Sequence, residues 1–389
     1  MRIDKNKHDC SGCGACALKC PKKAISMQPD EMGFMYPIID DGLCVDCGLC
    51  VKVCNFSEDN IKDNLPDAVY AGRLKDEVAL AKSQSGGAFW AIASHIINDG
   101  GVVFGAALSD DFSVAHIEVK SLADLERLRG SKYIQSRLND IYCKVKQRLQ
   151  DGRKVLFSGT PCQVSGLLSF LSPKNYDNLY TADLVCHGVP SPKVWLDYLR
   201  WIEAKENDKI IGCNFRDKSF GWASCFETFS TKKKGKISKY IFSELFFRHY
   251  ISRESCHYCL FTNLHRVSDI TVGDFWGWGK VSDRFGDNKG ISLILVNTAK
   301  GRELLDAAST VMILQPSNTR DCLQPQLMHP APRACKKDKF LNDYQSKGFN
   351  YVVHKYALVG WRKRVRDCRA EIGLFIRKVK FHVNKFRNK

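Results

Sequence analysis

The sequence predicts a small cysteine-rich α+β module, a larger α/β domain with a mainly parallel sheet, and a basic helical C-terminal tail. Three observations predict these parts: two cysteine runs of identical spacing near the amino terminus, strand-like runs that alternate with helical patterns after residue 75, and a concentration of lysine and arginine at the end. The expected boundaries are a module over 1–60, a linker over 61–75, the α/β domain in two parts over 76–160 and 161–345, and a tail over 346–389.

Each cysteine run has the spacing of a ferredoxin motif that binds [4Fe–4S] clusters. In two-cluster ferredoxins the fourth cysteine of each run binds the other cluster. We therefore expect the first cluster at Cys10, Cys13, Cys16 and Cys54, and the second at Cys44, Cys47, Cys50 and Cys20. A zinc site and a disulfide framework are the alternatives. The sulfur-only CxxCxxC triplet, present twice with its distal partner, favours clusters over both.

Small residues around the cysteines fit a ferredoxin-like module. Gly12, Gly14 and Gly48 let the backbone pass close to sulfur, where amide groups stabilise the charge of a cluster. Pro21 suits the first turn of a short helix that would begin near Cys20. Asn55 stands where the second run would be expected to carry a proline.

Length and composition indicate a reducing compartment and several domains. A chain of 389 residues suggests two or three domains with ample chain for a core. Eighteen cysteines would suggest disulfides in a secreted protein, but the first residues lack the apolar stretch of a signal peptide. No apolar run reaches the roughly eighteen residues of a membrane span. We therefore expect a cytoplasmic protein.

The net charge of +17 is concentrated at the C-terminal end. Residues 362–389 hold eleven lysines or arginines against two acidic residues, and apolar residues recur among them at roughly helical spacing. This pattern predicts an amphipathic basic helix that could contact anionic lipid or an acidic partner, or a helix that is simply solvated. No DNA- or RNA-binding motif accompanies the charge, so we expect no nucleic acid as a partner.

The polar stretch after Cys54 predicts the linker, and an alternating pattern follows it. Strand character is present at 102–107, 116–119, 155–158 and 180–186, and helical patterns cover 88–97 and 138–149. Alternation of strands and helices is typical of an α/β domain with a largely parallel sheet.

The turn Ser85-Gly86-Gly87 precedes the helical pattern at 88–97. Unpaired amides at a helix start can bind a phosphate, so the pyrophosphate of a dinucleotide could lie there. An ordinary turn is the alternative interpretation.

Four further cysteines could converge on a third cluster. Cys162 and Cys186 each follow an apolar strand, and parallel strands end at the same edge of a sheet, where ligands collect. If Cys256 and Cys259 fold over that edge, four thiolates could hold a [4Fe–4S] cluster. Each of these cysteines could instead be an ordinary core residue.

Several longer strings carry a resemblance to a known family. They are SQSGGAF, GGVVFGAAL, RGSKYIQS, KVLFSGTPCQVSGL, DLVCHGVPSPKVW, FRDKSFGW and SCHYCLFTNLHRVSDITVGDFWG, in order over roughly residues 70–345. This region resembles the coenzyme F420 hydrogenase/dehydrogenase beta-subunit family. The resemblance implies a domain that binds FAD and an iron–sulfur cluster and passes electrons between them.

The resemblance also implies site residues. The flavin would be bound by Ser85, Gly86 and Gly87 together with Ser131, Lys132 and Tyr133, and the domain's cluster by Cys162, Cys186, Cys256 and Cys259. Lys132 and Arg129 are candidates to offset negative charge on the flavin or its phosphates, or are solvated surface groups. Asp274 is expected near the site or in a turn, and no catalytic residue is assigned.

These cofactors predict a protein that moves electrons. A flavin exchanges two electrons with an organic donor and releases them singly, whereas each cluster carries one. The expected partners are a ferredoxin or another redox protein and a small electron donor or acceptor, such as a deazaflavin. The alternatives are an oxidoreductase with its own substrate, an electron-transfer subunit that relays electrons to a partner enzyme, and clusters that serve only as structural staples or sensors.

Overall fold

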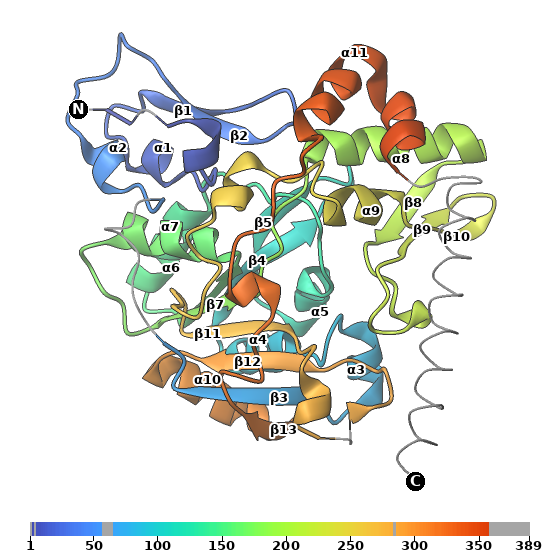
Figure 1. Cartoon of the computed structure of the whole chain (residues 1–389). Coiled ribbons are helices and arrows are strands. Elements are labelled where there is room, and N and C mark those ends of the chain that lie inside the picture. Colours follow the sequence, from blue (N-terminus) through green and yellow to red (C-terminus); the bar gives the residue numbers. More distant parts are fainter. Residues whose placement is uncertain (1, 4, 57–64, 283–284, 358–389) are drawn as a thin grey trace, which may run out of the picture.

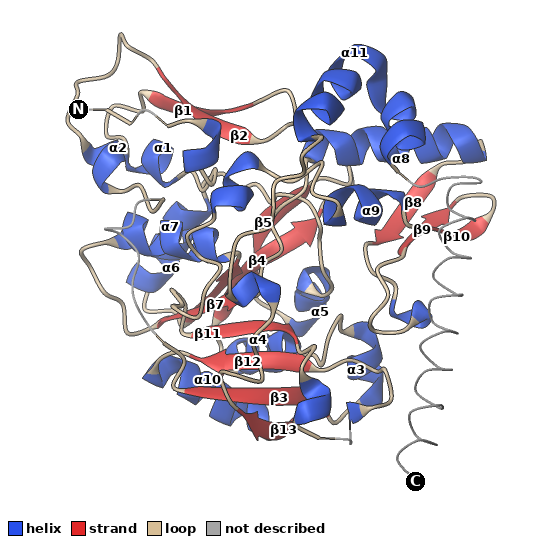
Figure 2. Cartoon of the chain, viewed as in Figure 1, coloured by secondary structure: helices blue, strands red, loops and turns tan. Residues whose placement is uncertain are grey.

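The structure is a computed structural model that describes the chain except for residues 1, 4, 57–64, 283–284 and 358–389. Its described part contains three sheets, of two, three and eight strands. Figure 1 shows the N-terminal module beside α6 (Ile141–Gln150) and α7 (Pro161–Leu171), and Figure 2 shows helices on both faces of the large sheet.

The N-terminal module is built from two short helices and one hairpin. Strands β1 (Ile25–Pro29) and β2 (Met35–Ile39) pair antiparallel, and the helices are α1 (Ala15–Lys19) and α2 (Leu49–Lys52). Gly14 and Gly48 occupy equivalent places in the two cysteine runs and precede these helices with φ of 76° and 73°, a conformation that favours glycine. The repeated spacing in the sequence is therefore a repeated backbone conformation.

The helix expected from Pro21 lies elsewhere. α1 lies inside the first cysteine run, Cys20 follows its last residue, and Pro21 begins a turn. The prediction of a helix start at Pro21 was wrong because Gly14 already starts a helix earlier in the run.

The large sheet has the strand order β13-β3-β12-β11-β7-β6-β4-β5. Its strands are β3 (Ala68–Leu74), β4 (Val102–Leu108), β5 (Val114–Val119), β6 (Val155–Gly159), β7 (Leu179–Leu184), β11 (Ile270–Asp274), β12 (Ser292–Val296) and β13 (Met312–Ser317). The four central strands β11, β7, β6 and β4 are parallel, whereas the pairs toward both edges are antiparallel. The predicted parallel sheet is confirmed at its centre, and the whole sheet is mixed.

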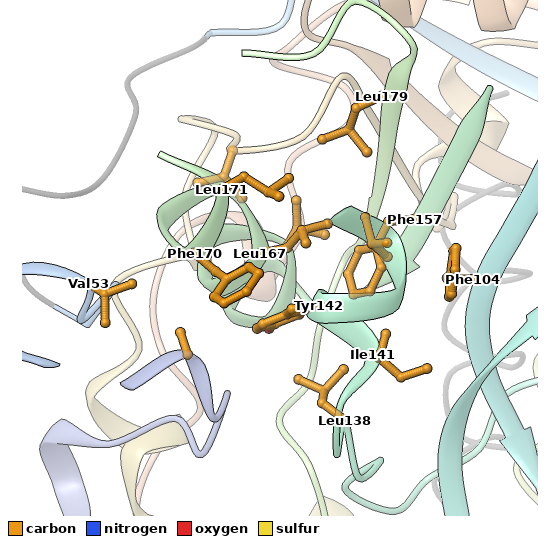
Figure 3. Packing of buried hydrophobic residues seen from close by; sticks show 14 of the residues in the cluster. Val53, Phe104, Leu138, Ile141, Tyr142, Phe157, Leu167, Phe170, Leu171 and Leu179 are labelled. Atoms are coloured by element: carbon orange, nitrogen blue, oxygen red, sulfur yellow. The ribbon is translucent and has the colours of Figure 1, made fainter. Parts of the chain in front are cut away.

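Alternate residues of the central strands enter different cores. Phe104 and Phe157 point to the face covered by α6 (Ile141–Gln150) and α7 (Pro161–Leu171), where Figure 3 shows them packed with Tyr142. Val103 and Leu156 point to the other face, covered by α4 (Ala88–Asn98) and α10 (Ala299–Ser309). The core of the first face continues into the N-terminal module through the buried Val53. Module and sheet therefore share one core.

A second, antiparallel sheet lies beside α8 (Pro192–Glu206) and was not predicted. It consists of β8 (Ile210–Asn214), β9 (Glu227–Thr231) and β10 (Gly235–Lys239). A layer of aromatic side chains joins α8 to α9 (Ile241–Phe247) and α11 (Lys337–Tyr356). The remaining α-helices of the described chain are α3 (Glu77–Lys82) and α5 (Leu122–Leu125).

Two predicted segments differ from their expected description. The range 61–75 was expected as a linker but contains β3, whose residues pack into the large sheet between β12 and β13. The range 346–389 begins inside α11, and most of the predicted basic helical tail lies outside the described residues. In the described chain, no helix combines the length and the apolar character needed to cross a bilayer.

Candidate functional site

The structure brings the first predicted set of four thiols to one cavity. Cys10, Cys13 and Cys16 enter it from the loop before α1 and from α1 itself, and Cys54 enters from the segment just after α2. The fourth thiol therefore comes from the other cysteine run, as the crossed arrangement requires.

The second set lines a separate cavity in the same module. Cys44, Cys47 and Cys50 surround it together with Cys20. Backbone amides donate to two of these sulfurs: Ala24 to Cys20 and Ile3 to Cys50, both over 3.3 Å. Such bonds stabilise negative charge on thiolate sulfur.

Cys162, Cys186, Cys256 and Cys259 line a third cavity at the edge of the large sheet. Cys162 lies in the first turn of α7 after β6, and Cys186 follows β7, the parallel neighbour of β6. Cys256 and Cys259 belong to the 3-10 helix η5 (Glu254–Tyr258) and the residue after it. The segment with Cys256 and Cys259 therefore lies over the sheet edge, as the sequence predicts.

Burial opposes ionisation of the third group of thiols. It raises the pKa of Cys256 to about 11 and that of Cys259 to about 12, with a smaller contribution from the neighbouring thiols. Burial and the neighbouring cysteines also raise the pKa of Cys186, although Gly188 donates its amide to this sulfur over 3.4 Å. Buried thiolates repel one another, and the irons of a cluster would supply the positive charge that stabilises them.

A cluster and a single metal ion place different demands on these residues. In the described chain, no group of three His, Cys, Asp or Glu side chains is arranged to hold one metal ion. A [4Fe–4S] cluster instead takes one thiolate on each of four irons. Three cavities with four thiols each fit that donor set.

A larger cavity lies between the helix α4 and the carboxyl edge of the sheet. Ser85, Gly87, Ser131, Lys132 and Tyr133 line it, which places five of the six predicted flavin residues on its wall. The sixth, Gly86, does not line the cavity. A Cβ there would lie 2.0 Å from the carbonyl oxygen of Gly72, so Gly86 permits close approach to β3.

Polar groups around this cavity fit a polar ligand. Lys218 donates to the carbonyl oxygens of Ser83 and Ser85, both over 2.9 Å, and thereby holds the turn before α4. Gln84 Nε2 and Arg129 Nε belong to residues that line the same cavity, are buried, and have no hydrogen-bond partner among the described residues. Buried donors without a partner are costly, so they indicate a ligand that accepts hydrogen bonds.

The two predicted basic residues occupy different environments. Arg129 stacks on Trp90 with 3.8 Å from its guanidinium carbon to the ring centre, and it pairs with Glu126 over 2.9 Å. Lys132 donates to the carbonyl oxygens of Arg127 and Arg129, and burial lowers its pKa to about 7, against a small opposing influence of Cys213. Both side chains are held by the protein rather than freely solvated.

Replacing Lys132 with Met should change how stability depends on pH. Since the unfolded chain has an ordinary lysine pKa, it binds more protons than the folded protein between about pH 7 and 10, and the folded state gains stability as pH rises there. The difference in unfolding free energy between wild type and Lys132→Met should therefore shift in favour of the wild type from pH 7 to pH 9 in urea titrations. Lys144→Met, at an exposed ion pair, is the control. Equal pH slopes for wild type and Lys132→Met would contradict the prediction.

Asp274 lies at the end of β11 and lines the large cavity. It forms an ion pair with the buried Arg216 and accepts a hydrogen bond from Trp222 Nε1 over 2.7 Å. Sequence reasoning placed Asp274 near the site but assigned nothing to Arg216 or Lys218. Both residues lie in the string FRDKSFGW, which carries the family resemblance and is the sequence feature that could have indicated them.

His116 is another residue of the large cavity that the sequence did not indicate. Its ring nitrogens lie 2.8 Å from Ser136 Oγ and 3.0 Å from the carbonyl oxygen of Ser158, and burial lowers its pKa to about 4. A histidine on a strand gave no pattern from which this position could be predicted.

The four cavities form a series through shared lining residues and one hydrogen bond. Ile3 lines the first cavity and donates to Cys50 of the second, while Ser11 and Phe56 line both the first and the third. The third and the large cavity share a wall made of Thr160, Gln163, Cys186, His187, Gly188 and Val189. Groups bound in the four cavities would be neighbours in the order second, first, third, large.

Comparison with family models confirms the resemblance inferred from the sequence. Residues 9–57 match the model described as 4Fe-4S dicluster domain. Residues 152–320 match the model for the C terminus of the beta subunit in the coenzyme F420 hydrogenase/dehydrogenase family. The second match includes the four cysteines of the third cavity, whereas the predicted flavin residues lie outside it.

Two curated proteins of Methanocaldococcus jannaschii are similar to the chain. A coenzyme F420-dependent sulfite reductase is 24% identical over 311 residues, which cover 77% of this chain and 46% of the reductase. An uncharacterized protein is 24% identical over 196 residues, which cover 43% of this chain and 54% of that protein. The chain thus spans about half the length of the curated relatives it matches.

A solved structure is also similar. It is a structure of the F420-reducing [NiFe] hydrogenase complex from Methanosarcina barkeri, with a TM-score of 0.46 and 19% identity over 67% of this chain and 84% of that chain.

Proposed function

We propose that the chain, an iron–sulfur oxidoreductase related to F420-dependent enzymes, holds three [4Fe–4S] clusters and one FAD and passes electrons between them. One observation carries this proposal: three cavities with four thiols each and one large cavity with buried, unpartnered donors lie next to one another in a series. Structural staples or sensors would not need such a series, because isolated clusters stabilise a fold equally well.

The residues of the large cavity would hold and orient the flavin. Gln84 and Arg129 offer free donors, the turn before α4 offers a helix N-terminus, and Lys132 offers a proton-dependent positive charge. When bound, FAD exchanges two electrons with a donor and releases them one at a time, as single clusters require. The shared wall of Cys186 and His187 would separate the flavin from the third cluster by protein rather than by solvent.

Only the names of the relatives suggest which small substrate the protein uses. Two comparisons name coenzyme F420, a deazaflavin that carries a hydride, and the large cavity would bring such a molecule against the flavin. Reduced F420 is therefore the first donor to test. The second cluster, at the other end of the series of cavities, would deliver or receive single electrons.

One observation favours a relay to a partner protein as a second candidate function. Among the twelve cysteines of the three cavities, all of them described, only Cys47 is exposed. Val45 and Leu49, which line the second cavity with it, are also exposed and give this cavity an apolar rim. A ferredoxin or another redox protein could exchange electrons there.

Cofactor stoichiometry tests the proposal. Protein purified without oxygen should contain about twelve irons, about twelve acid-labile sulfides and one FAD per chain. About eight irons in the wild-type protein would contradict the third cluster. Absence of flavin would leave the electron relay as the only candidate function.

Flavin reduction then tests the substrate. Stopped-flow absorbance should show bleaching of the flavin by reduced F420 and no bleaching at equal concentration of NADH. Bleaching by reduced ferredoxin but not by reduced F420 would favour the relay, with electrons entering at Cys47.

A further inference from the structure

Arg253 is a buried arginine between two of the cavities. It is 1% exposed, and its guanidinium donates to the carbonyl oxygens of Cys10 over 2.8 Å and Met35 over 3.0 Å. The third bond goes to Gln135 Oε1 over 2.9 Å, and Gln135 in turn donates to the carbonyl oxygen of Ser11. One side chain from the cluster loop of the large domain therefore fixes the cysteine loop of the N-terminal module.

The positive charge of Arg253 has no carboxylate partner in the described chain. The other fully buried arginine, Arg266, pairs with Asp183 over 3.0 Å. Arg253 instead faces the ring of Tyr36, whose centre lies 4.1 Å from the guanidinium carbon. Burial raises the pKa of Tyr36, so this ring is neutral. Because a buried charge without compensation is unfavourable, the missing negative charge must come from another source.

The predicted cluster ligands lie on both sides of this guanidinium. Arg253 lines the third cavity, and the amide of Cys256 donates to its carbonyl oxygen over 3.1 Å. On the other side, a Cβ at Gly12 would lie 2.9 Å from Arg253 Nη1, so the guanidinium occupies the space beside the first cysteine loop. The guanidinium therefore lies beside the loops that would carry the thiolates of two clusters.

Other contacts also hold the first and third cavities close together. Asn55 donates to the carbonyl oxygen of Cys162 over 2.5 Å and accepts from Cys13 Sγ over 3.3 Å. A Cβ at Gly166 of α7 would lie 3.1 Å from Cys13 Sγ, so only glycine lets the module approach the helix that carries Cys162. The charge of Arg253 therefore acts on both sites over short distances through a medium with little water.

We infer that Arg253 is a positioning residue that serves the first and third clusters together, holding their loops in register and raising the reduction potentials of both. The inference rests on the proposed function, which supplies the clusters. Each reduction adds one electron, received from the flavin or a neighbouring cluster, to a cluster that already carries negative charge from four thiolates. Arg253 keeps its proton throughout and favours the reduced state by electrostatic attraction.

Variants of Arg253 separate charge from shape. Arg253→Gln removes the charge and Arg253→Lys keeps it while losing the planar fork. In potentiometric titrations followed by EPR on protein with a full iron content, Arg253→Gln should shift the potentials of the first and third clusters to more negative values and leave the signal of the second cluster unchanged. Arg253→Lys should stay closer to wild type. Equal shifts for both variants, or no shift for Arg253→Gln, would overturn the inference.

A second variant covers the case in which Arg253→Gln loses iron. Gln135→Glu places a carboxylate on Arg253 Nη1 and compensates its charge without removing the side chain. It should shift the same two potentials in the same direction, and unchanged potentials would contradict the inference. Arg2→Gln is the control, because Arg2 lines the second cavity but is half exposed and already paired with Asp41.

Failure of the inference about Arg253 can be distinguished from failure of the proposed function. Wild-type protein with only eight irons would show that the third cluster is absent. Twelve irons with unchanged potentials in Arg253→Gln and Gln135→Glu would leave the clusters in place and refute the role of Arg253 alone.

Discussion

Replacing Cys162 with Ser is expected to remove about four irons and leave about eight. The thiol lies in the first turn of α7 and lines the third cavity with three other cysteines, and a serine hydroxyl is a poor ligand for a [4Fe–4S] cluster. The first and second cavities contain no atom of Cys162, so their clusters should persist. Iron and sulfide assays on protein purified without oxygen, together with the EPR signal after reduction, measure the loss.

Cys143→Ser is the matched control for this experiment. Cys143 lies in α6, is exposed, and lines none of the four cavities, so its replacement should leave about twelve irons. If Cys162→Ser also retains twelve, the ligand assignment at the third cavity is wrong. Loss of all iron in Cys162→Ser would instead show that the three clusters assemble as a unit.

Replacing Arg266 with Met should lower the unfolding free energy by about 3–5 kcal/mol. Asp183 is 0% and Arg266 1% exposed, and removal of the arginine leaves a buried carboxylate without its counter-ion. Arg266 also donates to the carbonyl oxygens of Phe261, over 2.8 Å, and Leu184, over 3.2 Å, which fasten the loop after Cys259 to the end of β7. Urea titration of the cluster-containing protein gives the free energy.

A double-mutant cycle and a surface control define the source of this loss. Asp183→Asn combined with Arg266→Met should cost less than the two single changes added together, because the unpaired charge is gone. Arg148→Met, at a partly exposed pair with Glu118, should cost no more than about 1 kcal/mol. Equal losses for Arg148→Met and Arg266→Met would show that burial of the Asp183 pair is not decisive.

The cysteine spacing predicted how the thiols group because ligand spacing is a local property of the chain. Cysteines that are separated by two residues on a tight loop can reach one cluster whatever the rest of the fold, and the crossed fourth cysteine follows from the repeat. For Cys162 and Cys186, the alternation of strands and helices was enough, since parallel strands end at one edge. The flavin residues, by contrast, followed only from the family resemblance and remain a proposal.

Other features depend on contacts between distant segments and left no local pattern. Asn55 was noted only as a missing proline, although its side chain joins Cys13 to Cys162. Gly86 was expected at the ligand but instead lies against β3. The sheet of β8, β9 and β10 escaped notice because β9 and β10 lie in a polar and lysine-rich stretch.

The position of β3 has a consequence for how the protein is made. β3 leaves the ribosome soon after the N-terminal module, but its neighbours in the sheet, β12 and β13, are synthesised more than two hundred residues later. Both edges of β3 stay unpaired throughout that interval, and such contacts of large sequence separation form slowly. Because the module and the sheet share a core, the nascent module waits for the last strands before its surroundings are complete. A delay in translation would lengthen the period in which a strand edge is open to aggregation.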